Sequence, residues 1–301
     1  MQGNIRKMIT TDSNPVAYTL PIGEEQIPLN SLLGKTLCLT FTGDIHCVVC
    51  GRKTKKSFNQ GYCYPCFRDL AQCDLCIVKP ELCHYDQGTC REPEWGEAHC
   101  MQPHIVYVAN SSGLKVGITR GSQIPTRWMD QGAVQALPVF RVQSRYQAGL
   151  LEVMFKKHIS DRTDWRRMLK GDPEPADLSA KSAELRSICS DELDKQRAVA
   201  GEAGISLLEE EAVRSFAYPV LEYPTKVKAL NFDKTQEIAG TLLGIKGQYL
   251  IFDTGVLNVR KFGGYWLQFE GWRLRRETHP GRRPQVGSAT PPNRLPSREI
   301  L

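Results

Sequence analysis

Cysteine is the residue type that dominates the chemistry available to this chain. Nine of its 11 cysteines lie between Cys47 and Cys100. The first four follow the pattern Cys47-x2-Cys50-x12-Cys63-x2-Cys66, in which two CxxC hooks stand a dozen residues apart. Such hooks present four thiolates to one tetrahedral zinc ion. Because four sulfur ligands leave no open coordination position, the pattern predicts a structural zinc site rather than a catalytic one.

A second group of cysteines follows at near-regular spacing. Cys73, Cys76, Cys83 and Cys90 would make a second four-sulfur site. The rival ligands in the same segment are Cys100, His84 and His99. Four cysteines also bind an iron–sulfur cluster, but such clusters usually bring a denser CxxCxxC run, which is absent here. We therefore expect one or two structural zinc ions and keep an iron–sulfur cluster as the alternative.

Five polar residues after the cysteines are not what a plain hydrophobic core would use. Tyr107 and Lys115 stand within short apolar runs. Arg127 and Gln131 are four residues apart, so on a helix they share one face. Glu152 falls on the apolar face of a later helical pattern, where a carboxylate is costly unless it is paired or bound to a cation. A purely structural ion pair between Glu152 and Arg127 is the alternative.

Short strands and helices must position these five side chains. Periodicity and turn residues predict strands at 105–108, 114–118 and 139–142, and helices at 126–132 and 146–159. The sequence Asn-Ser-Ser-Gly between the first two strands joins them into a hairpin. A small sheet with two helices is therefore expected between residues 104 and 170.

The segment 105–155 resembles the GIY-YIG nuclease domain, a small sheet-and-helix fold that cuts phosphodiester bonds. Val106-Tyr107-Val108 stands where that family has its first signature tripeptide. Lys115-Val116-Gly117 stands where the family has the second, with a lysine in place of its tyrosine.

The resemblance implies a role for each matching residue. Tyr107 would help to activate water, Arg127 would steady the phosphate, and Glu152 would hold one magnesium or manganese ion. Lys115 would counter phosphate charge at the position of the second tyrosine. Gln131 stands where some members have a histidine four residues after the arginine. These roles predict catalysis by Tyr107, Lys115, Arg127 and Glu152, and contacts with nucleic acid from Arg120, Arg127 and Gln131.

A longer stretch of the chain resembles a bacterial family of uncharacterised proteins with no assigned activity. The motifs that carry this resemblance include CGRKTKKSFNQGYCYPC, PELCH, GTCR, VGITR, RWMDQGA and DRTDWRRML. The resemblance covers most of the chain and implies no mechanism.

The remaining segments complete an α+β, multi-domain prediction. Leucines alternate with polar residues near Leu37, which predicts a strand, and we expect it to join a small antiparallel sheet or barrel near the C-terminus. The predicted parts are an N-terminal strand region (1–45), a zinc-ribbon-like cysteine segment (46–103), a GIY-YIG-like domain (104–170), a helical spacer (171–214), a small β domain (215–272) and a disordered basic tail (273–301).

Charge and hydropathy indicate where in the cell the protein is expected. The net charge is +6, of which the tail from Arg273 onward supplies +5 through seven arginines and two glutamates. No apolar run approaches the roughly 20 residues of a membrane helix, and the first residues do not look like a secretory signal. A cytoplasmic protein without a membrane partner is expected, where clustered cysteines bind metal rather than form disulfides.

Together these patterns predict a zinc-binding protein that acts on DNA or RNA, with divalent-metal-dependent cleavage as the leading activity. The first alternative is a module that binds nucleic acid without cutting it. A redox or modification enzyme with an iron–sulfur cluster is the second alternative. Residue patterns do not distinguish DNA from RNA and do not fix an oligomeric state.

Overall fold

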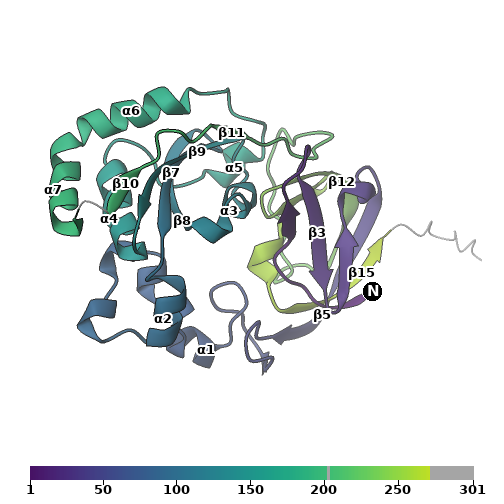
Figure 1. Cartoon of the computed structure of the whole chain (residues 1–301). Helices are drawn as coiled ribbons and strands as arrows, with labels where there is room; N and C mark the ends of the chain where they lie inside the picture. The colour runs from purple at the N-terminus through teal and green to yellow at the C-terminus, as the bar shows by residue number, and fades with distance from the viewer. Residues whose placement is uncertain (202–203, 272–301) are drawn as a thin grey trace, which may run out of the picture.

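The computed structural model describes residues 1–201 and 204–271. Within them the fold is a mixed α+β arrangement of three antiparallel sheets with short helices beside them (Figure 1). The predicted basic tail at 273–301 lies outside the described residues.

The largest sheet joins the beginning of the chain to its last described strand. Its strands are β1 (Gln2–Asn4), β5 (Thr36–His46), β6 (Lys53–Thr54), β12 (Glu237–Lys246), β13 (Tyr249–Phe252), β14 (Gly255–Asn258) and β15 (Tyr265–Gly271). The order is β1-β15-β5-β12-β13-β14, and β6 pairs with β5. Leu39 of β5 stands between Ile238 of β12 and Phe269 of β15. The strand predicted near Leu37 therefore joins the C-terminal sheet, as expected.

A smaller sheet packs into the same hydrophobic core. It consists of β2 (Ile9–Thr11), β3 (Ala17–Ile22) and β4 (Glu25–Pro28) in sequence order. Tyr18, Leu20 and Ile22 alternate along β3 and are buried with the leucines of β5. Residues 1–45 and 215–271, which the sequence treats as separate domains, thus share one sheet and one core. Local periodicity does not reveal pairing between strands so distant in the chain.

A third sheet carries the predicted hairpin. Its strands are β7 (His104–Asn110), β8 (Leu114–Arg120), β9 (Gln135–Val142), β10 (Ile205–Leu207) and β11 (Arg214–Ser215). The order is β10-β9-β7-β8, and β11 pairs with β9. β7 and β8 pair in a hairpin register that sets Tyr107 opposite Gly117 and Ala109 opposite Lys115. The predicted hairpin is confirmed.

The two faces of this third sheet are buried against different partners. Side chains alternate along a strand, so Val106 and Val108 face one way and Tyr107 the other. The valines belong to a core with α4 (Arg145–Phe155) and α6 (Leu178–Ile188). Tyr107 belongs instead to the core shared with the largest sheet, together with Trp128 of α3 (Thr126–Asp130). The strand that carries Tyr107 therefore lies between the two halves of the molecule.

The predicted helical spacer at 171–214 is in fact a covering layer of the third sheet. Its helices are α6 and α7 (Ser190–Ala200), which follow the short α5 (Trp165–Met168). Leu178 and Leu185 of α6 are buried against the valine face of the sheet. The end of the segment forms β10 and β11, which both pair with β9 in antiparallel register. No helix in the described part of the chain combines the length and the apolar character needed to cross a membrane.

The cysteine-rich segment runs from the end of β5 to the start of β7. It contains α1 (Tyr64–Asp69), α2 (Pro93–His99) and four 3₁₀ turns at Ala71–Cys73, Leu75–Ile77, Pro80–Leu82 and Tyr85–Gln87. Figure 1 shows α1 and α2 at the bottom of the molecule, below the third sheet. Further 3₁₀ turns occur at Asn30–Leu32, Gly121–Gln123 and Val259–Phe262.

Candidate functional site

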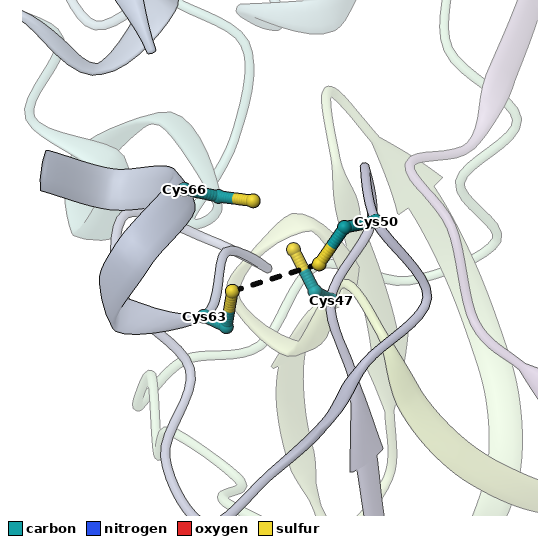
Figure 2. Close-up of side chains that lie close together, drawn as sticks. All are labelled: Cys47, Cys50, Cys63 and Cys66. Carbon is teal, nitrogen blue, oxygen red and sulfur yellow. Dashed lines mark hydrogen bonds between the residues drawn. The ribbon is translucent and has the colours of Figure 1, made fainter. Parts of the chain in front are cut away.

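The first four cysteines converge on one point. Cys47 follows β5 directly, Cys50 is on the next loop, Cys63 precedes α1 and Cys66 lies within it. Their sulfur atoms all lie within 4.8 Å of one another, and those of Cys50 and Cys63 are 3.7 Å apart (Figure 2). Metal–sulfur bonds of about 2.3 Å in a tetrahedron give sulfur–sulfur distances of about 3.8 Å. The four cysteines therefore could hold a metal ion such as zinc.

Backbone groups prepare this cluster for a cation. Burial disfavours the Cys47 thiolate, but hydrogen bonds from the backbone of Cys50, Cys63 and Val49 and from the Cys50 thiol together lower the Cys47 pKa to about 6. Burial and the neighbouring thiols raise the pKa of Cys66. Four thiols this close do not all ionise without a cation between them, because each thiolate disfavours the next.

Four of the later cysteines line one cavity. Cys76, Cys83 and Cys90 were predicted as ligands of the second site, and Cys100 was kept as a rival. Cys76, Cys83, Cys90 and Cys100 lie around a partly enclosed cavity of about 20 Å³. Burial, Asp74 and the other three thiols raise the pKa of Cys76 to about 11, which places its sulfur within electrostatic reach of all three.

Cys73 lies apart from this cavity, beside the first cluster. Burial raises the pKa of its thiol, a hydrogen bond with Asn59 lowers it, and Cys47 raises it. The rival ligand His99 is a packing residue: its ring stacks on Trp95 with centroids 4.2 Å apart, and its Nδ1 lies 2.9 Å from the Trp95 carbonyl oxygen. Of the four cysteines predicted for the second site, Cys73 is thus the one that does not line this cavity.

Asp74 and His84 lie close to Cys76 as well, but they have partners of their own. The three donor atoms are within 4.8 Å of one another. The Asp74 carboxylate pairs with Arg91 at 2.6 Å and faces His84 Nε2 at 3.6 Å. The other ring nitrogen of His84 is 2.7 Å from the Thr89 hydroxyl. These residues form a connected polar network at the rim of the cavity.

The structure brings the predicted catalytic residues of the hairpin into one hydrogen-bonded group. The Tyr107 hydroxyl donates to Gln131 Oε1 at 3.0 Å, and Lys115 Nζ donates to the same oxygen at 2.5 Å. Both donors are almost fully buried. Burial lowers the pKa of Lys115 to about 7, with Arg127 acting in the same direction and Glu152 opposing it. Arg127 also lowers the pKa of Tyr107, which burial raises.

Gly117 makes room for this group. A Cβ atom at that position would lie 2.6 Å from the Tyr107 hydroxyl oxygen and 2.7 Å from the ring carbon that bears it. The other side of the Tyr107 ring meets Trp128 edge-on, with centroids 5.8 Å apart. The phenol is therefore held in one position by Gly117 on its strand partner and by Trp128 on α3.

Tyr107, Lys115, Arg127 and Gln131 are together called the hairpin group. Glu152 is half-buried on α4 and lies within electrostatic reach of this group. Burial and Asp161 raise its pKa to about 7, whereas Arg145, Lys156 and Arg127 lower it. Within residues 1–201 and 204–271 its carboxylate makes no hydrogen bond and no salt bridge. The structural ion pair between Glu152 and Arg127, kept as an alternative, is thus absent from the described part of the chain.

Arg120 lies apart from the other residues predicted to contact nucleic acid. It ends β8, while Lys115 is near the beginning of the same strand, five residues or about 17 Å away. Its charge acts on Cys100 and His104. Arg127 and Gln131, by contrast, lie with Tyr107 and Lys115. Arg120 is therefore at the opposite end of β8 from the group around Lys115.

A basic segment beside the hairpin group was not singled out by the sequence analysis. Residues 156–170 follow α4, and Val116 donates a backbone hydrogen bond to Ser160 at 2.8 Å, next to Lys115. The exposed cations of this segment outnumber its two acidic residues; they are Lys156, Lys157, Arg162, Arg166, Arg167 and Lys170. The signal available in the sequence was their density around DRTDWRRMLK.

Three antiparallel sheets and a four-cysteine cluster define a mixed α+β protein with a candidate metal centre and a separate polar group on a buried hairpin. The chain belongs to the family described as "Protein of unknown function (DUF2797)", whose model matches residues 34–267. That match begins just before β5 and ends within β15. Comparison with curated proteins and with solved structures gave no match.

Proposed function

We propose that this protein cleaves phosphodiester bonds in nucleic acid at the group formed by Tyr107, Lys115, Arg127, Gln131 and Glu152. The observation that carries the proposal is the Glu152 carboxylate, half-buried and without a hydrogen bond or salt bridge among the described residues. An inward carboxylate is costly unless a cation accompanies it. A magnesium or manganese ion held by Glu152 would supply positive charge against the phosphate.

The hydrogen bonds of Gln131 suit it to contact a phosphate. Its Oε1 accepts from both Tyr107 and Lys115, so the amide orientation is fixed. The Nε2 group is then left to donate, and the described residues offer it no acceptor. Arg127, on the same helix, adds a guanidinium that matches phosphate oxygens in pairs. The two side chains together would grip one phosphate.

Lys115 occupies the position where the GIY-YIG resemblance places a tyrosine. With its pKa lowered to about 7, its amine reaches the unprotonated state near neutral pH. An amine in that state accepts a proton, which a phenol with a raised pKa such as Tyr107 does not do. We assign proton acceptance to Lys115 and assign Tyr107 to holding Gln131 in position.

Nucleic acid is the substrate class that the neighbouring charges favour. The six exposed cations of residues 156–170 lie on the segment that runs beside Lys115. Such a segment attracts a phosphate backbone without reading sequence. The four-cysteine cluster is proposed to hold zinc as a structural support, because soft thiolates in a closed tetrahedron favour that ion.

The proposal is tested by incubating the protein with labelled single-stranded and double-stranded DNA and RNA in the presence of magnesium or manganese. The variants are Glu152→Gln and, as a matched control, Glu184→Gln, which changes an exposed glutamate of α6. We expect cleavage of at least one substrate by the wild type and by Glu184→Gln, and a loss on the order of 100-fold or more in Glu152→Gln.

Two other outcomes would contradict the proposal in different ways. Binding of nucleic acid by the wild type, without cleavage under any of these conditions, would indicate a binding module instead. Equal cleavage by Glu152→Gln and the wild type would place the chemistry elsewhere in the molecule.

A further inference from the structure

The cysteine-rich segment contains two sulfur clusters of different size. In the first, all four sulfur atoms lie within 4.8 Å of one another. In the second, formed by Cys76, Cys83, Cys90 and Cys100, no three sulfur atoms meet that limit, although all four residues are described and line one cavity. The sulfur atoms are therefore farther apart in the second cluster than in the first.

The sulfur atoms of the second cluster stand farther apart than a single zinc ion requires. Zinc–sulfur bonds of about 2.3 Å bring four sulfur atoms to about 3.8 Å from one another, whereas no three of these four lie within 4.8 Å of one another. The cavity that they line has a volume of about 20 Å³. A larger inorganic group with four cysteine ligands is an iron–sulfur cluster.

Asp74, Cys76 and His84 form a smaller set of donor atoms at the same cavity, but two of the three already have partners. Asp74 already pairs with Arg91, and His84 is engaged by Asp74 and Thr89. Cys73 is not among the residues that line the cavity, and its thiol is within electrostatic reach of Asn59, Arg91 and Cys47. Asp74 and His84 also line the cavity but have these partners, so the four cysteines are its soft donors.

Contacts from outside the segment fix the backbone at Cys100 and next to Cys76. The backbone N–H of Arg145 donates to the Cys100 carbonyl oxygen at 2.8 Å. The Arg145 side chain donates to the Ile77 carbonyl oxygen at 2.6 Å, next to Cys76. This half-buried guanidinium also places positive charge beside Cys100, which suits a site of several thiolates.

We infer that Cys76, Cys83, Cys90 and Cys100 bind an iron–sulfur cluster, separate from the metal ion held by the first four cysteines. This assignment differs from the sequence prediction in one ligand, because Cys100, kept there as a rival, takes the place of Cys73. It does not depend on the proposed nuclease activity.

The test is the metal and sulfide content of the full chain, purified without oxygen and then treated with ferrous iron and sulfide under reducing conditions. We expect iron and acid-labile sulfide in equal amounts, about two or four of each per chain, with a brown colour, in addition to zinc. Cys100→Ser should lose the iron and keep the zinc. Cys73→Ser and His84→Ala should keep both.

Retention of zinc by Cys100→Ser shows that this variant still folds around the first cluster. Two zinc ions per chain in a colourless protein would overturn the inference. Loss of iron in Cys73→Ser but not in Cys100→Ser would overturn the ligand assignment. Loss of bound metal in His84→Ala would instead favour the donor set of Asp74, Cys76 and His84.

Discussion

At the scale of single residues, the burial of Lys115 lowers the stability of the folded protein, because its amine loses hydration. Lys115 is 3% exposed, has no carboxylate within salt-bridge distance among the described residues, and donates to the neutral Gln131. A buried amine loses hydration that one hydrogen bond to an amide does not replace. Such a residue is a candidate for function because packing alone would not select it.

Replacing Lys115 by methionine is predicted to stabilise the fold at pH 7, on the order of 1–4 kcal/mol. The Lys115 pKa falls from 10.5 to about 7 on folding, so between those values the unfolded chain binds more protons than the folded one. Wild-type stability should therefore rise from pH 7 to pH 10, and the advantage of the variant should shrink. Denaturant titrations at both pH values measure this, with the exposed Lys170→Met as control. A variant less stable than the wild type at pH 7 would contradict it.

Gly117→Ala is predicted to destabilise the protein by about 1–3 kcal/mol. Alanine normally favours a strand over glycine, but here its Cβ would lie 2.6 Å from the Tyr107 hydroxyl oxygen. Because Tyr107 is buried against Trp128, its ring has little space to move away. Gly121→Ala, where no atom lies within 4 Å of the added carbon, is the matched control for chemical unfolding. Equal stabilities of the two variants would show that the ring adapts.

At the scale of elements, α4 connects the two candidate sites. Its first residue, Arg145, bonds to the cysteine segment, and it carries Glu152 two turns later. Gly149, between them, packs against the 3₁₀ turn at Pro80–Leu82. The cysteine segment therefore fixes the helix that positions the carboxylate.

Gly149→Ala tests this contact. In a free helix the change would stabilise by about 1 kcal/mol, but here the new carbon would lie 2.7 Å from Pro80 and from the backbone nitrogen of Glu81. We expect the clash to prevail, with a net loss of about 1–3 kcal/mol. Thermal unfolding beside the Gly121→Ala control measures it. A variant more stable than the wild type would mean that α4 does not depend on this contact.

The elements nearest to the candidate site were predictable because their signals are local. The hairpin follows from two short apolar runs around a turn, and α4 from apolar residues at helical spacing. The packing of α6 against the third sheet was missed because the charges of the segment favoured an exposed helix pair, although the buried Leu178, Ser182 and Leu185 stand at helical spacing. Cys100 was separated from Cys76 by 23 residues, and sequence spacing favoured the nearer Cys73, which does not line the cavity.

At the scale of the whole molecule, the first cysteine cluster joins the largest sheet to the cysteine segment. His46, just before Cys47, donates to the Gly264 carbonyl oxygen at 2.8 Å, and Val48 donates to Gly61 at 2.8 Å. Metal binding contributes folding energy where the ligands come from separate loops. The cluster is therefore expected to stabilise the whole described fold and not only its own loops.

Cys63→Ser is predicted to lose zinc and to lower the melting temperature by several degrees. Cys38→Ser, a half-buried strand cysteine outside both clusters, should keep the zinc and melt close to the wild type. Metal analysis and thermal unfolding of the two variants provide the comparison. Full zinc retention in Cys63→Ser would exclude Cys63 as a ligand.

The account's central claim is that Glu152 and the hairpin group cut nucleic acid, and the most direct test is the cleavage rate at pH 8 with manganese present. At that pH the Glu152 carboxylate, with a pKa of about 7, is mostly ionised and able to hold a cation. We predict a measurable rate for the wild type and a rate lower by on the order of 100-fold or more for Glu152→Gln. Equal rates in the two proteins, or no cleavage by the wild type of any DNA or RNA substrate, would contradict the claim.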